Sequence, residues 1–547
     1  MQRLAIQNKA KGLYPIMSAD KQVISVFNGE VYNHTSLEKL LVSKGRRYAE
    51  GSDGACLSEG FQFLGNSLID LLDGMFAIAF WDTESLSLTL SRDHLGIKPL
   101  YYFFEKNLLI FSSEPKSILA LRSSPTFTRS FKLNLNLGVI ENLAHFMFAP
   151  GNDESFSNEI KQVAPGEILT FSEGGLKSAI SSNSGLSQQN KISELTTAVD
   201  AVESELINSI GRHLVADVPI ALALSGGIDS SLIAEISKTE FNRPLDSFCI
   251  SFIDDQRSEN LQAQLIAKQF CNSFKIVEID SKLIAEDFDT HIRLFENLST
   301  LDGGLISNAL MAKSMARDGF KVALFGEGAD EMFGGYTWFQ LNEGIFKTFP
   351  LVIKKQIYMY AITRDPKLLL GIKTISSKNS FKNILEFIQN FEISAQLPQH
   401  LLKKVDSATM AASVEGRVPY LDGELYRLQT RIHSSLKSSM PKFGFLPDSS
   451  RTKPILRGVY SRRIGRPGEV PPSKKGFQLP LDTLTNMKLN EIQDLMTSTN
   501  SLSRVFLSPR EFRGLQNLKK NELSDSDSWQ LWRILILEKW NELIWIP

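Results

Sequence analysis

The sequence predicts a mixed α/β protein whose N-terminal and C-terminal parts are built differently. Up to about residue 171, short strands and turns follow one another, whereas from residue 194 strands alternate with helices. Between them, residues 172–193 are rich in Ser, Gly, Asn and Gln and show no sustained apolar period, which is typical of a connector. We therefore expect two domains, at residues 1–171 and 194–547, joined by a linker at residues 172–193.

The N-terminal part is expected to be an α+β domain with short strands. β-branched and aromatic residues at 23–27 and the alternation Leu-Ser-Leu-Thr-Leu at 86–90 both favour strands. The strands expected here lie at 23–27, 76–81, 86–90 and 108–111, and the helices at 36–44 and 57–64.

The C-terminal part is expected to contain a parallel sheet. Its strands should lie at 220–224, 245–252, 274–279 and 321–325, and its helices at 194–213, 231–238, 262–269 and 309–317. Strand–helix–strand repetition implies right-handed crossovers, which place the successive strands parallel. The rest of the chain is predicted to be mostly helical, and Trp532, Leu535, Ile536 and Trp540 have the spacing of a packed helix near its end.

Composition excludes several classes of protein. The 60 Lys and Arg residues balance 61 Asp and Glu residues, so the net charge of −1 gives no drive toward nucleic acid or an anionic membrane. No stretch reaches the roughly 18 apolar residues of a membrane span, and no secretory signal is visible. The three cysteines, Cys56, Cys249 and Cys271, are too few for a disulfide framework and suit a reducing compartment. We therefore expect a cytoplasmic protein that binds neither nucleic acid nor a membrane.

The sharpest local signal is the loop Ser225-Gly226-Gly227-Ile228-Asp229-Ser230-Ser231, which follows the apolar strand expected at 220–224. Two glycines allow backbone N–H groups to close around an anion, and the helix that follows adds its partial positive charge. Asp229 has the wrong charge to hold a phosphate directly, which suggests a divalent cation between them. The alternative is a Ser/Gly turn that only caps a helix.

This loop resembles the pyrophosphate-binding loop of the ATP pyrophosphatase fold. The chain lacks the P-loop motif of common nucleoside triphosphatases. The resemblance implies that a carboxylate or carbonyl oxygen attacks the α phosphorus of ATP and that pyrophosphate leaves. It assigns ATP binding to Leu224, Ser225, Gly226, Gly227, Asp229 and Ser230.

A second motif, Gly326-Glu327-Gly328-Ala329-Asp330-Glu331, follows the strand expected at 321–325. Carboxylates at the end of a parallel strand lie where open α/β sheets bind ligands, although an acidic helix start has the same composition. Together with the first loop, this motif resembles the asparagine synthetase family. The resemblance makes Glu327 and Asp330 catalytic. It also places the nucleotide at Phe325 and Gly326, and Mg²⁺ at the carboxylates of Asp229 and Asp330.

Two further stretches carry the same resemblance. Residues Thr409 to Asp422 are similar to the segment that lines the aspartate and adenylate site, although Glu415 and Arg417 also fit a surface ion pair. Lys474 lies 21 residues after Lys453, which matches the family's spacing to a catalytic lysine. A lysine there would offset the charge that grows at the α phosphorus. Lys475 is the alternative.

The N-terminal part resembles a class II glutamine amidotransferase, which implies an antiparallel sandwich. The stretch from Phe27 to Asn33 is close to that family's glutamine-binding turn. The resemblance implies an oxyanion hole at Asn28 and Gly29, and contacts to the α-amino group of glutamine from Glu30 and Asp53 and to its carboxylate from Arg3.

The nucleophile of that amidotransferase family is a cysteine at the N-terminus, with its own α-amine as the base. This chain begins Met1-Gln2-Arg3, and none of its cysteines lies near the start. We therefore expect an incomplete N-terminal domain that does not hydrolyse glutamine.

As a whole, the resemblance implies an ATP-dependent amide ligase that uses Mg²⁺. Such an enzyme would adenylate the side-chain carboxylate of aspartate and transfer ammonia, free or from glutamine, to give asparagine, AMP and pyrophosphate. Two alternatives stay open: a ligase of β-lactam synthetase or lasso cyclase type that acts on another carboxylate, and an inactive homologue that serves as a partner subunit. The oligomeric state, with a homodimer as one option, is also open.

Overall fold

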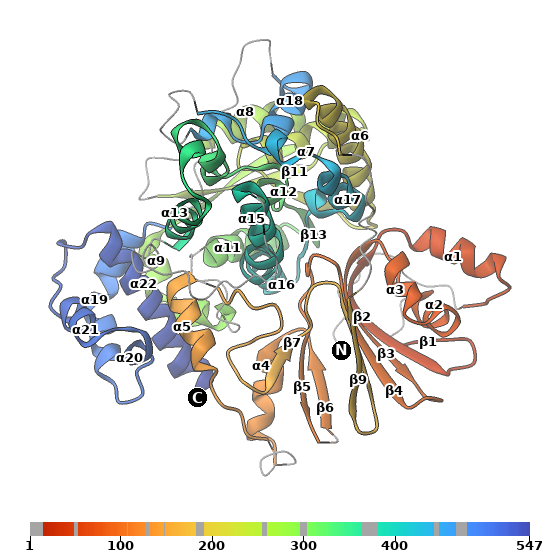
Figure 1. Ribbon diagram of the computed structural model, residues 1–547, viewed down its shortest axis with the longest axis horizontal. Coiled ribbons are helices and arrows are strands. Elements are labelled where there is room, and N and C mark those ends of the chain that lie inside the picture. Colours follow the sequence, from red (N-terminus) through yellow and green to blue (C-terminus); the bar gives the residue numbers. More distant parts are fainter. Residues whose placement is uncertain are drawn as a thin grey trace.

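The computed structural model describes residues 15–48, 53–106, 108–125, 131–146, 148–181, 191–253, 260–295, 304–363, 381, 383–441, 448–465 and 479–546. These residues confirm the mixed α/β class. Antiparallel sheets form the N-terminal part, and a parallel sheet lies in the C-terminal part (Figure 1).

Two antiparallel sheets pack face to face in the N-terminal part. The larger has the order β1-β2-β3-β4-β8-β9 and the smaller has the order β6-β5-β7. Apolar residues of β3, β4 and β8 meet those of β5 and β6 in one shared core, so the predicted sandwich is confirmed. The strands are β1 (Ile16–Met17), β2 (Val23–Val31), β3 (Gly74–Asp82), β4 (Ser87–Arg92), β5 (Tyr101–Glu105), β6 (Leu108–Ser112), β7 (Ile160–Gln162), β8 (Glu167–Ser172) and β9 (Gly175–Ser181).

Helices cover the outer face of the larger sheet (Figure 1). Phe76, Ile78 and Phe80 of β3 point to that face because side chains alternate along a strand, and they pack against the helices in a second apolar core. The helices of this part are α1 (His34–Ser43), α2 (Leu57–Leu64), α3 (Ser67–Leu71), α4 (Pro115–Leu119) and α5 (Leu137–Phe146).

Arg92 fixes the turn that joins β4 to β5 and brings this turn to the C-terminal part. Its guanidinium is buried and donates to the carbonyl oxygens of Gly96, Lys98 and Val163. The backbone N–H of Lys98 donates to Asp93, and the Lys98 ammonium lies 2.9 Å from the carboxylate of Asp406. The turn therefore anchors one part of the molecule on the other.

The C-terminal part is built on a five-stranded parallel sheet with the order β12-β11-β10-β13-β14, which confirms the predicted parallel sheet. Its strands are β10 (Ile220–Ala223), β11 (Asp246–Phe252), β12 (Ser273–Ile279), β13 (Val322–Leu324) and β14 (Glu415–Arg417). β14 was not expected as a strand, because three residues are too few to show a periodic pattern.

Helices surround this sheet and continue to the end of the described chain. The sheet contacts α7 (Ile228–Thr239), α8 (Asn260–Phe270), α11 (Gly304–Arg317) and α16 (Leu402–Met410), and α6 (Leu195–His213), α12 (Ala329–Phe333), α17 (Gly423–Arg431) and α18 (Pro454–Arg463) pack against one another or against α7. More distant are α9 (Ser281–Glu286), α10 (Phe288–Ile292), α13 (Leu351–Thr363), α15 (Ile384–Phe391), α19 (Leu481–Thr497), α20 (Ser503–Phe506), α21 (Pro509–Gln516) and α22 (Asp525–Trp540).

The C-terminal helix α22 joins the two parts. Trp532 and Trp540 are fully buried, as expected for a packed helix, and Trp540 meets Phe156 of the N-terminal part with ring centroids 5.0 Å apart. Figure 1 shows α22 beside α5, and one continuous apolar core includes residues of both.

The predicted linker is wrong for residues 175–181, which form β9. This strand pairs with β8 at the edge of the larger sheet, and most of its side chains are exposed. An exposed edge strand needs few apolar residues, so its polar composition gave no signal. Residues 182–190 of the predicted linker lie outside the described residues.

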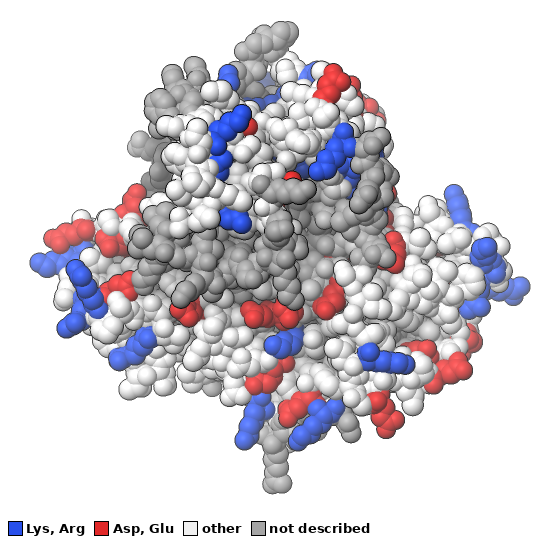
Figure 2. All heavy atoms as spheres, in the orientation of Figure 1, with Lys and Arg blue, Asp and Glu red and all other residues white. Residues whose placement is uncertain are grey.

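On the face shown in Figure 2, described basic and acidic side chains are interspersed, and neither sign gathers into one patch. Within the described ranges, no helix is both long and apolar enough to cross a membrane.

Candidate active site

A cavity of about 430 Å³ opens at the carboxyl ends of β10, β11 and β13, where open α/β sheets bind ligands. Further lining residues come from α11 and from helical segments that follow β13. The lining includes Leu224, Ser225, Gly227, Asp229, Ser230, Phe325, Gly326, Glu327 and Asp330, so the structure brings most of the predicted nucleotide-site residues together.

The loop after β10 is held in a fixed shape. Gly226 has a φ of 75°, and a Cβ there would lie 2.6 Å from the backbone N of Ala263, so the loop requires glycine. The hydroxyls of Ser225 and Ser230 lie 3.2 Å apart, and Ser225 Oγ accepts a bond from the backbone N–H of Gly227. Helix α7 begins at Ile228, three residues earlier than predicted, so its N-terminal N–H groups and Asp229 both lie at the loop.

Lys453 lies between two of the predicted acids. Its ammonium is 2.5 Å from Asp229 Oδ2 and 2.9 Å from Asp330 Oδ1, and all three residues are buried. A Cβ at Gly335 would collide with Asp330 and Lys453, so a glycine there lets the chain pass close to the cluster. From the sequence, Lys453 served only as the reference point for its 21-residue spacing to Lys474, and no role was predicted for Lys453 itself. Its one local signal is the Lys-Pro pair that opens α18.

Glu327 and Gly326 form the edge of the cavity on the β13 side. A Cβ at Gly326 would lie 3.0 Å from Asp229 Cβ, which shows how closely the two predicted motifs approach. Glu327 is half-buried and lines the cavity, so its carboxylate is available to a bound molecule.

Two predicted residues cannot be placed. Lys474, with the alternative Lys475, and Arg3 lie outside the described residues. Their assignments stay predictions.

The two acids fit a magnesium ion that also binds phosphates. Asp229 Oδ1 is a buried oxygen without a hydrogen-bond partner among the described residues. Within the same residues, no group of three or more His, Cys, Asp or Glu is arranged to hold a metal by itself. Mg²⁺ commonly takes one or two carboxylates plus substrate phosphates and water, so Asp229 and Asp330 suffice if ATP supplies the rest.

The predicted glutamine turn lies at the boundary with the C-terminal part. Asn28 Nδ2 is 3.4 Å from Ser113 Oγ, and Asp53 accepts a bond from the backbone N–H of Val31. Burial raises the pKa of Asp53 to about 6. Residues 27–31 of the predicted turn belong to strand β2 and not to a turn, and Gly29 is half-buried there, so this stretch is only partly open.

Glu30 already has a cationic partner. Arg417 Nη2 lies 3.1 Å from Glu30 Oε2, and Arg417 Nε lies 2.8 Å from Glu415. Arg417 also donates to the carbonyl oxygens of His213 and Val215 and is fully buried, so Glu415 and Arg417 form an internal ion pair and not the surface pair considered above. The carbonyl oxygen of Arg417 accepts a bond from the backbone N–H of Phe325, which connects the ion pair with Glu30 to the segment that follows β13.

A sequence model described as asparagine synthase matches residues 201–542, which is more than half of the chain. The chain belongs to the asparagine synthase family. A model described as a glutamine amidotransferase domain matches residues 1–181. The two resemblances stated above, to the asparagine synthetase family and to a glutamine amidotransferase, are therefore confirmed.

Relatives with named activities match at modest identity. Asparagine synthetase [glutamine-hydrolyzing] 1 of Bacillus subtilis is 26% identical, over 99% of this chain and 89% of that protein. Asparagine synthetase [glutamine-hydrolyzing] 3 of the same organism is 27% identical, over 77% of this chain and 72% of its own length. Asparagine synthetase B of Escherichia coli is 26% identical, over 76% and 72%.

Proposed function

We propose that this chain is an ATP-dependent amide ligase that converts aspartate to asparagine, with AMP and pyrophosphate as the other products. The observation that carries the proposal is the position of Lys453, Asp229 and Asp330, which form one buried charge cluster in the cavity beside the Ser225–Ser230 loop. A cluster of this kind suits the transfer of a group with several negative charges, because fixed charges stabilise the charge that develops in the transition state.

In the first step, an oxygen of the aspartate side chain attacks the α phosphorus of ATP. The bond from this phosphorus to the bridging oxygen breaks, and pyrophosphate leaves into the loop after β10. The N–H groups at the start of α7 and the hydroxyls of Ser225 and Ser230 bind the leaving phosphates. Lys453 adds a positive charge on the same side, and Lys474 is the second lysine that we assign to the α phosphate.

Asp229 and Asp330 would hold Mg²⁺ once ATP is bound. The bound ion would neutralise charge on the phosphates. Lys453 bridges the two carboxylates and keeps their charges compensated while ATP is absent.

In the second step, ammonia attacks the carbonyl carbon of the aspartyl adenylate and AMP leaves. The nitrogen must lose a proton as the amide forms. Glu327 lines the cavity on the β13 side, so we assign its carboxylate to accept that proton.

The cysteines described by the structure do not serve as nucleophiles for glutamine in this proposal. Cys56 is fully buried, and burial raises the pKa of its thiol to about 12, so a thiolate is scarce at neutral pH. Cys249 is also buried, and no disulfide links any of the three cysteines, which suits the cytoplasm that we propose as the compartment.

The test supplies ATP, Mg²⁺, aspartate and ammonium, so that it isolates the chemistry of the C-terminal part. We expect AMP and pyrophosphate to appear in equal amounts with asparagine. Release of ADP and phosphate would overturn the assigned chemistry. A panel of other carboxylic acids distinguishes aspartate from another acceptor, and an absence of pyrophosphate release with every acceptor would favour an inactive homologue.

A further inference from the structure

The cavity has a second end that the phosphate chemistry does not use. Directly after Gly335, which touches the charge cluster, the chain enters the 3₁₀ segment η3 (Thr337–Asn342). Tyr336 and Trp338 line the cavity here, and Gln396 and His400 face it from the segment η5 (Glu392–Leu401).

Tyr336 and Trp338 form a fixed aromatic wall. Their ring centroids lie 4.4 Å apart with an angle of 20° between the planes, so the rings are stacked. Tyr336 donates a hydrogen bond to Glu331, and the indole N–H of Trp338 donates to Glu392 Oε1 at 2.8 Å. Each ring is therefore held by one carboxyl group.

Glu392 is an unusual residue for its position. It is fully buried and borders an apolar cluster rich in phenylalanine, and its Oε1 also accepts a bond from Tyr358 at 2.9 Å. Its Oε2 has no hydrogen-bond partner among the described residues. Burial raises the pKa of Glu392 well above its usual value, and the neighbouring Glu331 raises it further. A buried carboxyl group costs free energy unless it is bonded, so its presence requires an explanation.

The segment that carries Glu392 is also unusual. η5 is a π-helix of ten residues that contains Pro398, whereas π-helical segments are mostly single turns, which are frequent at functional sites. It supplies Gln396 and His400 to the cavity. Gln396 lines the cavity, and its Oε1 has no hydrogen-bond partner among the described residues, so the capacity of this oxygen to accept a hydrogen bond is unused.

We propose that η5 is the recognition element for the ammonium group of an amino-acid acceptor. In this proposal Gln396 Oε1 accepts a hydrogen bond from that ammonium, the face of Trp338 lies against it, and Glu392 is a positioning residue that holds Trp338. The proposal rests on the proposed function, because it concerns the acceptor that the same cavity activates.

The chemistry of this end favours a cationic group. A carbonyl oxygen without a donor, an electron-rich ring face and the carboxylate of Glu331 all attract an ammonium. The acceptor would then carry its ammonium toward η5 and its reactive carboxylate toward Lys453 and the phosphates. This orientation selects amino acids over simple dicarboxylic acids.

The first experiment compares aspartate with succinate, which has the same two carboxylates but no amino group. The wild-type protein should prefer aspartate in kcat/KM by about tenfold or more, since a hydrogen bond to a charged group is lost with succinate. Gln396→Met removes the acceptor atom and keeps the volume, so it should lose most of this preference through KM for aspartate. Ser394→Ala, an exposed position on the same segment, should keep the preference.

The second experiment tests the role of Glu392 through Trp338. Glu392→Leu removes the partner of the indole N–H and should raise KM for aspartate while KM for ATP stays within about twofold of wild type. Glu392→Gln keeps an oxygen that accepts from Trp338 and Tyr358 and should rescue most of the affinity that the leucine variant loses. The melting temperature of each variant shows whether the fold is intact.

An unchanged preference for aspartate over succinate in Gln396→Met, with a folded and active protein, would overturn the proposal. A rise in KM for ATP that equals the rise for aspartate in Glu392→Leu would assign Glu392 a general structural role and overturn its positioning role. These outcomes are separate from failure of the proposed function, which would appear as an absence of pyrophosphate release in the wild-type protein with any acceptor.

Discussion

Two buried charge clusters in this molecule have similar composition and different surroundings. In the first, Lys453 bridges Asp229 and Asp330 at the wall of a cavity. In the second, Arg417 bridges Glu30 and Glu415 at the boundary between the two parts of the chain. Each cluster sets one cation between two carboxylates.

The clusters differ in whether they face a cavity. Arg417 directs its guanidinium at two carboxylates and two carbonyl oxygens and has no exposed surface. In the cavity cluster, Asp229 keeps an oxygen without a partner among the described residues, and the flexible lysine can move aside. The comparison teaches that the open cluster, at the wall of a cavity, fits chemistry, whereas the closed cluster, enclosed between the two parts of the chain, fits structure. An atom without a hydrogen bond does not distinguish them, because Arg417 Nη2 also has no hydrogen-bond partner among the described residues.

Removing the cation of the closed cluster should have the largest effect on stability. Arg417→Met removes the cation that lies between the buried carboxylates of Glu30 and Glu415, and breaking a buried ion pair in this way typically costs about 3–5 kcal/mol. We expect a large fall in the free energy of unfolding, measured by urea titration. Arg510→Met, at an exposed position, is the control and should change little. An unchanged unfolding midpoint for Arg417→Met would contradict the structural role.

Removing a carboxylate of the open cluster should instead affect the rate. Asp330→Asn takes away one charge beside the reacting phosphates, and such losses typically lower the rate by about 10²–10³-fold. Asp494→Asn, an exposed position on α19, serves as the control for a neutralised aspartate. Steady-state formation of pyrophosphate is the measurement, and near-normal rates in Asp330→Asn would remove this residue from the site.

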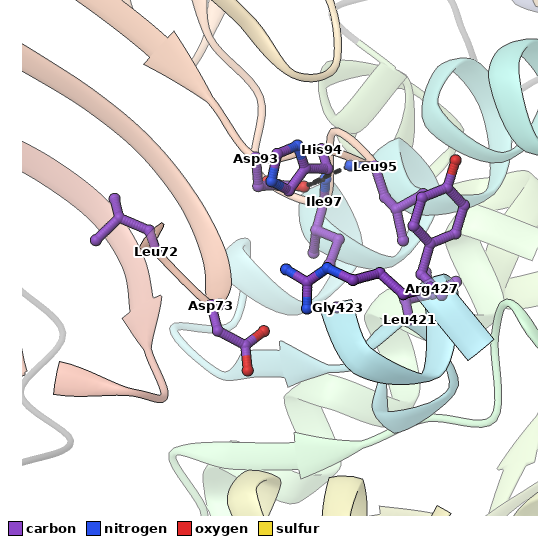
Figure 3. Close-up of a pocket in the computed structure, with 11 residues that line it drawn as sticks. Leu72, Asp73, Asp93, His94, Leu95, Ile97, Leu421, Gly423 and Arg427 are labelled. Carbon is purple, nitrogen blue, oxygen red and sulfur yellow. Dashed lines mark hydrogen bonds between the residues drawn. The ribbon is translucent and has the colours of Figure 1, made fainter. Parts of the chain in front are cut away.

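A smaller effect, on stability, is expected from replacing Asp73, an acid that also lies at the boundary between the two parts of the chain. Asp73, His94 and Arg427 line a small pocket of about 20 Å³, which has room for one water molecule (Figure 3). Burial, followed by the nearby Asp422, raises the pKa of Asp73 to about 6, although Arg212 opposes this shift. The ionised form of Asp73 therefore lowers the stability of the folded protein at neutral pH.

The sign follows from proton binding. The folded protein holds the Asp73 proton between the ordinary pKa near 4 and the raised pKa near 6, so its contribution to stability falls as the pH rises through that window. Asp73→Asn should be more stable than wild type by about 1–3 kcal/mol at pH 7.5, with a smaller difference at pH 5. Melting temperatures at the two pH values check this, and a variant that is less stable at pH 7.5 would contradict it.

The open cluster was only partly predictable from the sequence. The unit of β10, the Ser225–Ser231 loop and α7 could be recognised because an apolar run, two glycines and a helix lie next to one another. Lys453 could not, because it is 224 residues from Asp229 and only the fold brings them together. The bond between Trp338 and Glu392 spans 54 residues and was hidden for the same reason.

The closed cluster was predictable in its residues and not in its arrangement. Glu30 and Arg417 both belong to stretches that resemble functional segments, but their ion pair joins residues that are far apart in the sequence, one in each part of the chain. β9 and β14 were missed for local reasons, since one is a polar edge strand and the other is very short. The strands β1, β5, β7 and β8 were not predicted either, although β5 and β8 bury apolar residues.

The transfer of oxygen from the acceptor to AMP tests the proposed adenylation most directly. Aspartate labelled with ¹⁸O in both oxygens of its side-chain carboxylate is incubated with the protein, ATP, Mg²⁺ and ammonium, and the products are analysed by mass spectrometry. If the carboxylate attacks the α phosphorus, one ¹⁸O atom appears in each AMP and the other remains in asparagine. Label in inorganic phosphate, or asparagine formed with unlabelled AMP, would contradict adenylation at the site formed by Asp229, Asp330 and Lys453.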